Sequence, residues 1–228
     1  MDQRVAIVTG GFGALGRVVA RQALAAGYAV AAVDFAANPP AELASEVMAI
    51  GSVNLADAKQ AQDAVAAVAA RFGRIDAVFN IAGGFSWQTV QDGDAATWDR
   101  LHGLNLVTAL NMSKAALPQL LAGGAGRIVN VGANAALRAA TGMGAYAASK
   151  AGVHRLTEAM AEELKGRGVT VNAVLPSIID TPANRADMPD SDFAKWVTPQ
   201  DLAAVMLFLA SPAAGAITGA LIPVTGGL

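Results

Sequence analysis

Short apolar runs alternate with longer helical segments along the whole chain. Most of the runs are continuously apolar, which is typical of strands covered on both faces of a parallel sheet. The runs that we predict to be strands are Arg4–Thr9, Ala29–Asp34, Gly51–Val53, Ala77–Asn80, Arg127–Gly132, Thr170–Leu175 and Ala220–Val224.

Helical patterns fill the spaces between these strands. A clear helix start lies near the end of the chain, where Thr198 can cap, Pro199 fits the first turn and Asp201 follows three residues after the cap. The segments predicted as helices are Leu15–Ala26, Ala41–Met48, Ala58–Phe72, Thr97–Leu121, Ala145–Arg167 and Pro199–Ala210. This alternation predicts right-handed crossovers and an α/β fold: a Rossmann-type, doubly wound parallel sheet of about seven strands. No repeat or linker interrupts it, so residues 1–228 are predicted to form a single domain.

Composition narrows the possible functions. Hydrophobic residues make up 54% and charged residues 15% of the chain, which excludes intrinsic disorder. A net charge of −2 without a basic block argues against a nucleic-acid partner. Cysteine is absent, so disulfides, thiolate metal sites and cysteine nucleophiles are excluded. We find no signal-peptide pattern and no apolar stretch long enough to span a membrane, and we expect a cytoplasmic protein.

A glycine-rich loop joins the first predicted strand to the first predicted helix. Within it, Gly11-x-Gly13-x-x-Gly16 fits the dinucleotide fingerprint. Glycines let the backbone approach a pyrophosphate, and the helix start offers N–H groups and a positive dipole end. The alternative is a glycine-rich turn without a ligand. The loop residues predicted to bind cofactor are Gly10, Gly11, Phe12, Gly13, Ala14, Leu15 and Gly16.

An acidic residue, Asp34, ends the second predicted strand at a distance that suits this fingerprint. A carboxylate there accepts both hydroxyls of an adenine ribose and repels a 2′-phosphate. No arginine or lysine follows within Phe35–Leu43 to bind such a phosphate. The sequence therefore predicts NAD(H) rather than NADP(H).

A tyrosine and a lysine stand four residues apart, at Tyr146 and Lys150, in a predicted helix. That spacing places both side chains on one helix face. An ammonium beside a phenol lowers the phenol's pKa, and a tyrosine tuned in this way can exchange a proton near neutral pH. The alternative is a solvated helix surface.

With these motifs in this order, the chain resembles the short-chain dehydrogenase/reductase family over essentially its whole length. The resemblance implies that Tyr146 is the general acid/base, that Lys150 holds the nicotinamide ribose, and that Asn105 anchors a water in a proton relay. It further implies cofactor contacts at Asn54, Leu55, Asn80, Ala82, Gly83, Pro176, Ile179 and Thr181. It also favours a homodimer or homotetramer that pairs Ala145–Leu164 with Thr97–Leu121.

The chain departs from the family pattern at several positions. Ala133 stands where the family usually has a serine that binds the substrate carbonyl, and Asn134 follows it as a possible substitute. Ala14, Asn54 and Ser177 are further departures. Together with the stretches 10–16 and 175–196, these departures resemble the quinonoid dihydropteridine reductase branch, although Asn105 is more typical of the wider family. The branch resemblance implies NADH-dependent reduction of a quinonoid ring.

Aromatic and polar segments supply a candidate substrate pocket. Phe85 and Trp87 follow a strand end, where open α/β sheets bind ligands. The substrate residues predicted in this way are Phe85, Trp87, Ala133, Asn134 and Met143. Residues 181–197 are predicted as a lid, with an ordinary surface excursion as the alternative. The only histidines, His102 and His154, lie on different predicted helices, and we expect no metal site.

The predicted function is hydride transfer from NADH to a small, flat, polarised molecule, with Tyr146 supplying the proton. One alternative is an ordinary carbonyl or 3-oxoacyl reductase, or an alcohol dehydrogenase, in which Asn134 or water replaces the missing serine. Another is a catalytically silent NAD-binding sensor.

Overall fold

The computed structural model describes residues 3–228, which form a single α/β domain around one seven-stranded sheet. The strand order is β3-β2-β1-β4-β5-β6-β7, and every neighbouring pair is parallel. The strands are β1 (Val5–Thr9), β2 (Ala29–Val33), β3 (Met48–Ile50), β4 (Ala77–Asn80), β5 (Gly126–Val131), β6 (Val169–Pro176) and β7 (Leu221–Val224). This confirms the predicted Rossmann-type fold.

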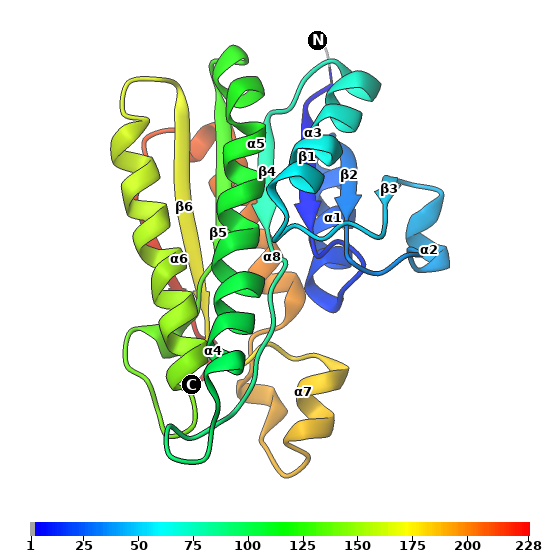
Figure 1. Ribbon diagram of the computed structural model, residues 1–228. Helices are drawn as coiled ribbons and strands as arrows, with labels where there is room; N and C mark the ends of the chain where they lie inside the picture. The colour runs from blue at the N-terminus through cyan, green and yellow to red at the C-terminus, as the bar shows by residue number, and fades with distance from the viewer. Residues whose placement is uncertain (1–2) are drawn as a thin grey trace.

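Helices cover both faces of the sheet (Figure 1). They are α1 (Ala14–Ala25), α2 (Ala41–Ala44), α3 (Ala58–Phe72), α4 (Ala95–His102), α5 (Thr108–Ala122), α6 (Gly144–Glu163), α7 (Pro182–Asp187) and α8 (Pro199–Ala210). In Figure 1, α3, α5 and α6 lie in front of the sheet, and α1 and α8 lie behind it. Short turns of other helix types are η1 (Gly103–Val107), η2 (Asn134–Ala136), η3 (Phe193–Lys195) and η4 (Pro212–Ala214). No helix in the described part of the chain has the length and apolar character that crossing a membrane requires.

The strand order reverses at β1, and this reversal positions the site. β1 pairs with β2 on one side and with β4 on the other, so the loops that leave β1 and β4 diverge at the carboxyl edge of the sheet. Open α/β sheets bind ligands in the crevice at such a switch point.

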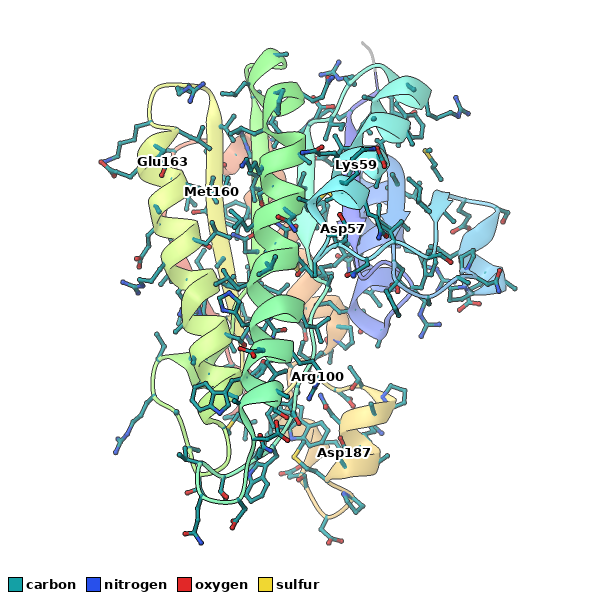
Figure 2. All side chains as sticks on the ribbon, in the orientation of Figure 1. Asp57, Lys59, Arg100, Met160, Glu163 and Asp187 are labelled. Carbon is teal, nitrogen blue, oxygen red and sulfur yellow. The ribbon has the colours of Figure 1, made fainter. Side chains whose placement is uncertain are left out.

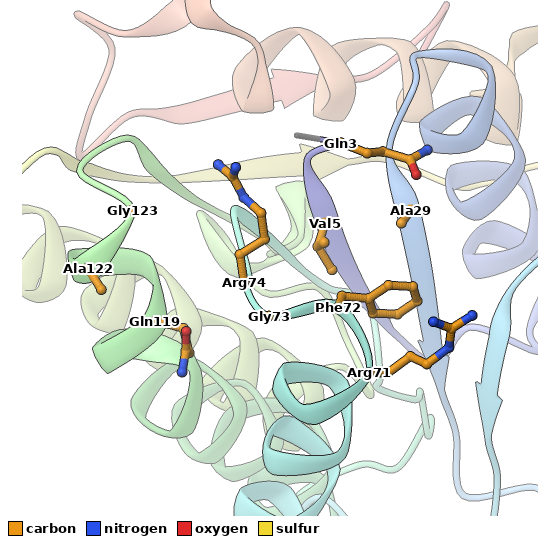
Figure 3. A pocket seen from close by; sticks show the side chains of 10 residues that line it. All are labelled: Gln3, Val5, Ala29, Arg71, Phe72, Gly73, Arg74, Gln119, Ala122 and Gly123. Atoms are coloured by element: carbon orange, nitrogen blue, oxygen red, sulfur yellow. The ribbon is translucent and has the colours of Figure 1, made fainter. Parts of the chain in front are cut away.

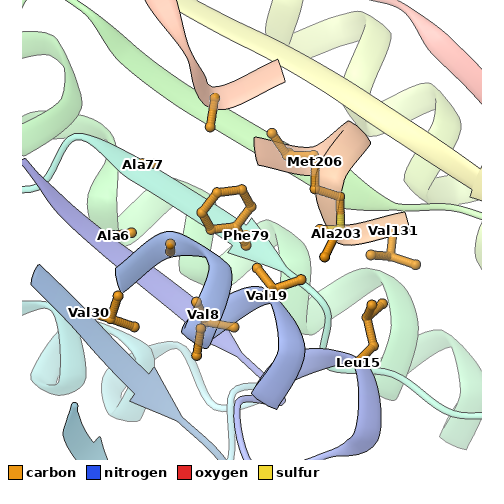
Figure 4. Close-up of a cluster of buried hydrophobic side chains, with 14 of the residues drawn as sticks. Ala6, Val8, Leu15, Val19, Val30, Ala77, Phe79, Val131, Ala203 and Met206 are labelled. Carbon is orange, nitrogen blue, oxygen red and sulfur yellow. The ribbon is translucent and has the colours of Figure 1, made fainter. Parts of the chain in front are cut away.

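The sheet has an apolar core on each face, which is why its strands read as continuous apolar runs. Phe79 and Val8 belong to the cluster under α1 and α8, where Met206 and Val19 pack (Figure 4). Ile7, the neighbour of Val8, points to the other face and joins the cluster that includes residues of α3 and α5. Alternate residues of one strand are therefore buried on opposite faces.

The third strand differs from the prediction. It is Met48–Ile50 rather than Gly51–Val53, and the helix predicted over Ala41–Met48 is confined to α2. The backbone turns after Ile50: Ser52 has a positive φ of 59°, and a Cβ on Gly51 would lie 2.1 Å from the carbonyl oxygen of Ala37. The strand therefore ends before the segment that was predicted to form it.

The helix predicted over Thr97–Leu121 is divided. A π-helical turn, η1, separates α4 from α5. By contrast, α3 begins at Ala58 as predicted, because the carboxylate of Asp57 accepts hydrogen bonds from the N–H groups of Lys59 and Gln60. Figure 2 shows Asp57 and Lys59 together at this helix start.

Candidate active site

The glycine-rich loop between β1 and α1 is shaped by close backbone contacts. Gly10 has a positive φ of 62°, and a Cβ on Gly16 would lie 2.1 Å from the carbonyl oxygen of Gly10. The N–H of Gly13 donates to that same oxygen at 3.1 Å. No side chain caps α1 at Gly13, so the first N–H groups of the helix lack a side-chain acceptor. The residues therefore fit a pyrophosphate, and its binding at this loop stays a prediction.

A cleft of about 560 Å³ opens beside this loop. Predicted cofactor residues supply most of its lining: Gly10, Phe12, Gly13, Ala14, Leu15, Gly16, Asp34, Asn54, Leu55, Ala82, Gly83 and Thr181. Phe35, Leu104 and Thr108 also line it and were not predicted. The signal for Phe35 in the sequence was its position directly after Asp34; in the structure its side chain is 76% exposed.

Asp34 is fixed at the end of β2 by backbone donors. Its Oδ2 accepts from the N–H of Phe12 and its Oδ1 from the N–H of Ala36, each at 2.9 Å. Each oxygen keeps a further lone pair for a ligand hydroxyl. Arg17, a basic residue on α1, is paired with Glu42 at 2.9 Å.

Several predicted cofactor residues do not line this cleft. Asn80 ends β4 but faces the interior, where its Nδ2 donates to Ser113 Oγ and Asn130 Oδ1, each at 2.8 Å. The Asn80 side chain therefore links β4 to β5 and α5, and its predicted contact with the cofactor stays a prediction. The alternation of side chains along β4 turns Asn80 inward.

The hydroxyl of Thr9, at the end of β1, positions the loop that follows β4. It accepts hydrogen bonds from the N–H groups of Ile81 and Ala82, each at 3.0 Å, and so holds the loop after β4 against β1. Sequence reasoning did not single out this residue. The sequence did contain an indication of this role, because a hydroxyl at the end of a buried strand needs a hydrogen-bond partner nearby.

Three more predicted cofactor residues lie outside the cleft lining. Gly11 packs against β2, where a Cβ would lie 2.7 Å from that of Ala32. Pro176 ends β6 in register with Val224, and Ile179 forms a bridge with Val197. Their predicted contacts with the cofactor stay predictions.

Tyr146 and Lys150 lie one turn apart at the start of α6, as predicted. Lys150 is buried, and its Nζ donates to the carbonyl oxygen of Val131 at 2.7 Å. A Cβ on Gly83 would lie 3.4 Å from this Nζ and 2.6 Å from Asn105 Oδ1. Lys150, Asn105 and the cleft-lining Gly83 therefore converge at one point.

The protonation states differ from the sequence-based expectation. Burial raises the pKa of Tyr146 to about 12 and lowers the pKa of Lys150 to about 8. The expected lowering of the tyrosine pKa by Lys150 is wrong for this arrangement, because removal of the phenol from water dominates. The lysine ammonium is instead directed to Val131.

Asn105 lies in the π-helical turn η1 and is buried. Its Nδ2 donates to the carbonyl oxygen of Gly84 at 3.0 Å and to Ser149 Oγ at 2.9 Å, and its Oδ1 accepts from the N–H of Gly84 at 2.9 Å. The side chain thus joins the loop after β4 to α6. Its predicted part in a water relay stays a prediction.

Of the predicted aromatic residues, Phe85 contacts Tyr146 and Trp87 contacts the loop before α6. The rings of Phe85 and Tyr146 meet edge to face with centroids 5.0 Å apart. Trp87 Nε1 donates to the carbonyl oxygen of Thr141 at 3.0 Å, and its indole covers Gly142, two residues from the start of α6. Met143 caps α6 between them. The loop after β4 and the loop before α6 are therefore held together beside the tyrosine.

Ala133 and Asn134 follow β5 on the same side of the molecule. Ala133 is buried, whereas Asn134 is half-buried at the start of η2. Within residues 3–228, the Asn134 amide has no hydrogen-bond partner. It is therefore free to contact a ligand.

The two ends of the segment predicted as a lid are joined by backbone hydrogen bonds. The N–H of Asp180 donates to the carbonyl oxygen of Val197 at 2.8 Å, and the N–H of Val197 donates to Ile178 at 2.9 Å. Between these contacts, Arg185 pairs with Asp180 and lies over the ring of Phe193. Thr181, the first residue of this segment, lines the cleft. The lid function itself stays a prediction.

A second hollow, of about 770 Å³, lies at the opposite, amino-terminal edge of the sheet (Figure 3). It is lined by Gln3, Val5, Ala29, Arg71, Phe72, Gly73, Arg74, Gln119, Ala122 and Gly123. Because it is remote from the glycine-rich loop, we do not assign it to the cofactor. Among the described residues, no cluster of His, Asp or Glu is arranged to hold a metal ion.

Comparisons with known proteins agree with this geometry. The short chain dehydrogenase family model matches residues 4–192. The chain is 33% identical over 248 residues to 2-(S)-hydroxypropyl-CoM dehydrogenase 3 of Xanthobacter autotrophicus, covering 100% of this chain and 97% of that protein. It is 34% identical over 242 residues to D-threitol dehydrogenase of Mycolicibacterium smegmatis, with coverage of 100% and 93%.

The fold is similar to a solved structure that contains cofactor. Carveol dehydrogenase from Mycobacterium avium, crystallised in complex with NAD, superposes with a TM-score of 0.88. The two chains are 26% identical, and the match covers 98% of this chain and 96% of the other. The chain therefore belongs to the short-chain dehydrogenase/reductase family of oxidoreductases, as its motifs predicted.

Proposed function

We propose that the protein is an NAD(H)-dependent oxidoreductase in which Tyr146 exchanges a proton with the substrate. The observation that carries the proposal is the convergence of Lys150 and Asn105 on Gly83, which joins the tyrosine's helix to the cofactor cleft. A catalytically silent sensor would not require this convergence. The bound nicotinamide supplies or accepts the hydride.

The preference for NAD(H) is supported by Asp34. Its two oxygens are oriented by backbone N–H groups at the edge of the cleft, where they suit ribose hydroxyls and repel a 2′-phosphate. The nearby Arg17 is engaged by Glu42. The structure of carveol dehydrogenase, which was solved in complex with NAD, also supports a preference for NAD(H).

The high pKa of Tyr146 supports a role as proton donor. The phenol stays protonated at neutral pH, so it can donate to a substrate that acquires negative charge as hydride arrives. Lys150, with its pKa of about 8, lies one helical turn away, and its positive charge can stabilise the phenolate that remains after proton transfer.

For the substrate we propose a flat, conjugated carbonyl or quinonoid ring, the class implied by the resemblance to dihydropteridine reductase. Ala133 offers no hydroxyl to a localised oxyanion, and a conjugated ring distributes that charge over its own atoms. Phe85, 53% exposed beside Tyr146, offers an apolar edge to such a ring.

A simple ketone or secondary alcohol is the second candidate. The unpartnered amide of Asn134, directly after Ala133, favours it because an amide N–H can replace the missing serine hydroxyl. The names of the hydroxypropyl and threitol dehydrogenases point the same way.

Kinetics of Ala133→Ser and Asn134→Ala distinguish the two candidates. With the conjugated substrate, Ala133→Ser should leave kcat/KM of quinone or quinonoid dihydropterin reduction unchanged or lower. It should raise kcat/KM for short ketones by about tenfold or more, since one oxyanion donor is worth ~10²–10³ in rate at its best. Strong wild-type ketone reduction that is lost in Asn134→Ala would contradict the conjugated-substrate proposal.

Tyr146→Phe tests the reaction type itself. It should nearly abolish turnover of every substrate while NADH binding, measured by calorimetry, stays close to that of the wild type. Turnover that survives at the wild-type level would overturn the assigned acid.

A further inference from the structure

His154 lies on α6, one turn after Lys150 and two turns after Tyr146. It is 2% exposed, and its Nε2 accepts a hydrogen bond from the N–H of Ala133 at 3.3 Å. We propose that His154 is a positioning residue, which holds the backbone of Ala133 and Asn134 at the place where the substrate's oxygen is bound. The proposal rests on the proposed function, because it assigns this backbone to the substrate.

Three successive residues, the last of β5 and the two that follow it, contact side chains of α6. The carbonyl oxygen of Val131 receives Lys150 Nζ, and the N–H of Ala133 donates to His154. Gly132 stands between them, and a Cβ there would lie 2.6 Å from His154 Nε2 and 2.8 Å from its Cδ2. The absence of a side chain at Gly132 therefore makes room for the imidazole.

The hydrogen bond to His154 is made by Ala133, the residue that stands where the family usually has a serine. Ala133 has no hydroxyl, and its N–H is occupied by His154, so neither group can be offered to a substrate oxygen. The polar group left at this end of η2 is the Asn134 amide, whose backbone follows directly from Ala133. A shift of Ala133 would therefore move Asn134 relative to Tyr146.

The contact requires a neutral imidazole. Nε2 accepts a hydrogen bond from the N–H of Ala133 only when it carries no hydrogen itself, which places the ring hydrogen on Nδ1. Burial is the largest cause that lowers the pKa of His154, followed by the positive charges of Arg155 and Lys150, while Glu158 opposes them. The groups that face the ring from the segment after β5 are Gly132 and the Ala133 backbone, which are uncharged.

Two replacements of His154 separate the hydrogen bond from simple filling of space. Gln places an acceptor oxygen where Nε2 lies, whereas Leu fills the volume and accepts nothing. We expect His154→Leu to lower kcat/KM on the order of tenfold, because a buried N–H without an acceptor forces its segment to move. His154→Gln should restore kcat/KM to within about threefold of the wild type, and His102→Gln on α4 is the matched control.

The pH profile gives a second readout. In the wild type, kcat/KM should fall at acid pH, below the ordinary histidine pKa of about 6.5, as His154 takes up a proton and releases Ala133. This acid limb should be absent in His154→Gln, whose amide does not titrate. A merely structural histidine would give the same profile in both proteins.

Magnetic resonance tests the proposal without turnover. The chain has two histidines, so His102→Gln leaves His154 as the sole imidazole. Its ¹⁵N shifts should show a hydrogen on Nδ1, an unprotonated Nε2 and a pKa below the ordinary value of about 6.5. A protonated Nε2 at pH 7 would overturn the proposal even if the enzyme is active.

A double-mutant cycle completes the test. Gly132→Ala should reduce kcat/KM in the wild type by displacing the imidazole, but should have little effect in His154→Ala, which has room for the added methyl group. Additive effects, or His154→Leu with wild-type kinetics, would overturn the positioning role. Loss of turnover in His154→Leu but not in His154→Gln, with NADH binding intact in both, would support it, whereas wild-type turnover in Tyr146→Phe would overturn the proposed function instead.

Discussion

The ionisable residues of the site differ in how they are held. Asp34 is oriented only by the backbone N–H groups of Phe12 and Ala36, whereas Lys150 is enclosed between α6 and the end of β5. A carboxylate that is exposed to the cleft acts on the ligand by charge. A buried ammonium acts on its neighbours and on the stability of the fold.

Asp34→Ala should narrow the difference between NADH and NADPH affinity. The change removes the repulsion of a 2′-phosphate and the acceptor for the ribose hydroxyls, so NADH should bind more weakly and NADPH more tightly. We expect the ratio of the two dissociation constants, measured by calorimetry, to change by about tenfold or more, which is ~1.4 kcal/mol.

Asp63→Ala is the matched control for that change, because Asp63 is an exposed carboxylate on α3 paired with Lys59. It removes one negative charge from the surface and should leave the ratio unchanged. NADPH binding that equals or exceeds NADH binding in the wild type would contradict the role of Asp34.

At the scale of elements, the site depends on two loops that contact each other. The loop after β4 carries Phe85 and Trp87, and the loop before α6 carries Gly142. The N–H of Gln88 donates to the carbonyl oxygen of Gly142 at 2.8 Å, next to the bond from Trp87 to Thr141. These bonds position Phe85 against Tyr146.

Gly142→Ala should disrupt this contact. Gly142 has a φ of 74°, and a Cβ would lie 2.1 Å from the Trp87 ring, so the indole must leave its place. We expect KM for the substrate to rise several-fold, with a smaller change in NADH binding because the cofactor cleft lies elsewhere. Steady-state kinetics and calorimetry measure the two effects.

Gly27→Ala separates the effect of the clash from that of backbone strain. Gly27 has a φ of 88° and no atom within 4 Å of a Cβ, and it lies between α1 and β2. Both variants should lose about 1 kcal/mol of stability from strain, but Gly27→Ala should keep the wild-type KM. Equal kinetics in the two variants would show that the Trp87 contact does not shape the site.

Most of the fold was predictable from the sequence because its strands are buried on both faces. The third strand was displaced because Gly51 and Ser52 form a turn that depends on the carbonyl groups of Ala36 and Ala37, contacts that no local pattern encodes. The π-helical turn around Asn105 was likewise invisible to helical periodicity.

The site was predictable where backbone geometry or charge is required, as at Gly10, Gly16, Asp34 and Lys150. It was not predictable where the direction of a side chain decides its role. Asn80 has the residue type of a ligand contact but faces the interior, while Thr9, unremarked in the sequence, holds the loop.

Considered as a whole, the molecule places an ammonium inside an apolar layer. Lys150 is 5% exposed on α6, and its Nζ donates to a neutral group, the carbonyl oxygen of Val131. Removing a charge from water costs free energy that a single neutral acceptor only partly offsets. The catalytic arrangement should therefore lower the stability of the fold near neutral pH.

Lys150→Met should reveal this cost as a pH-dependent difference in stability. The pKa of Lys150 is about 8 in the folded protein, against 10.5 for an unperturbed lysine. Between these values the unfolded chain binds more protons than the folded one, so the wild type gains stability relative to Lys150→Met as pH rises. The advantage of the methionine variant should be full below pH 8 and should shrink by about 3 kcal/mol by pH 10.5.

Chemical denaturation without cofactor at pH 7, 9 and 10.5 measures this difference. Lys114→Met, at an exposed position on α5, is the matched control and should follow the wild type across the same range. Lys150→Met should also lose turnover at every pH, because it removes the ammonium that lies one helical turn from Tyr146. A stability difference between wild type and Lys150→Met that stays constant from pH 7 to 10.5 would mean that the ammonium is hydrated in the folded state, and the buried arrangement of α6 against Val131 would then be wrong.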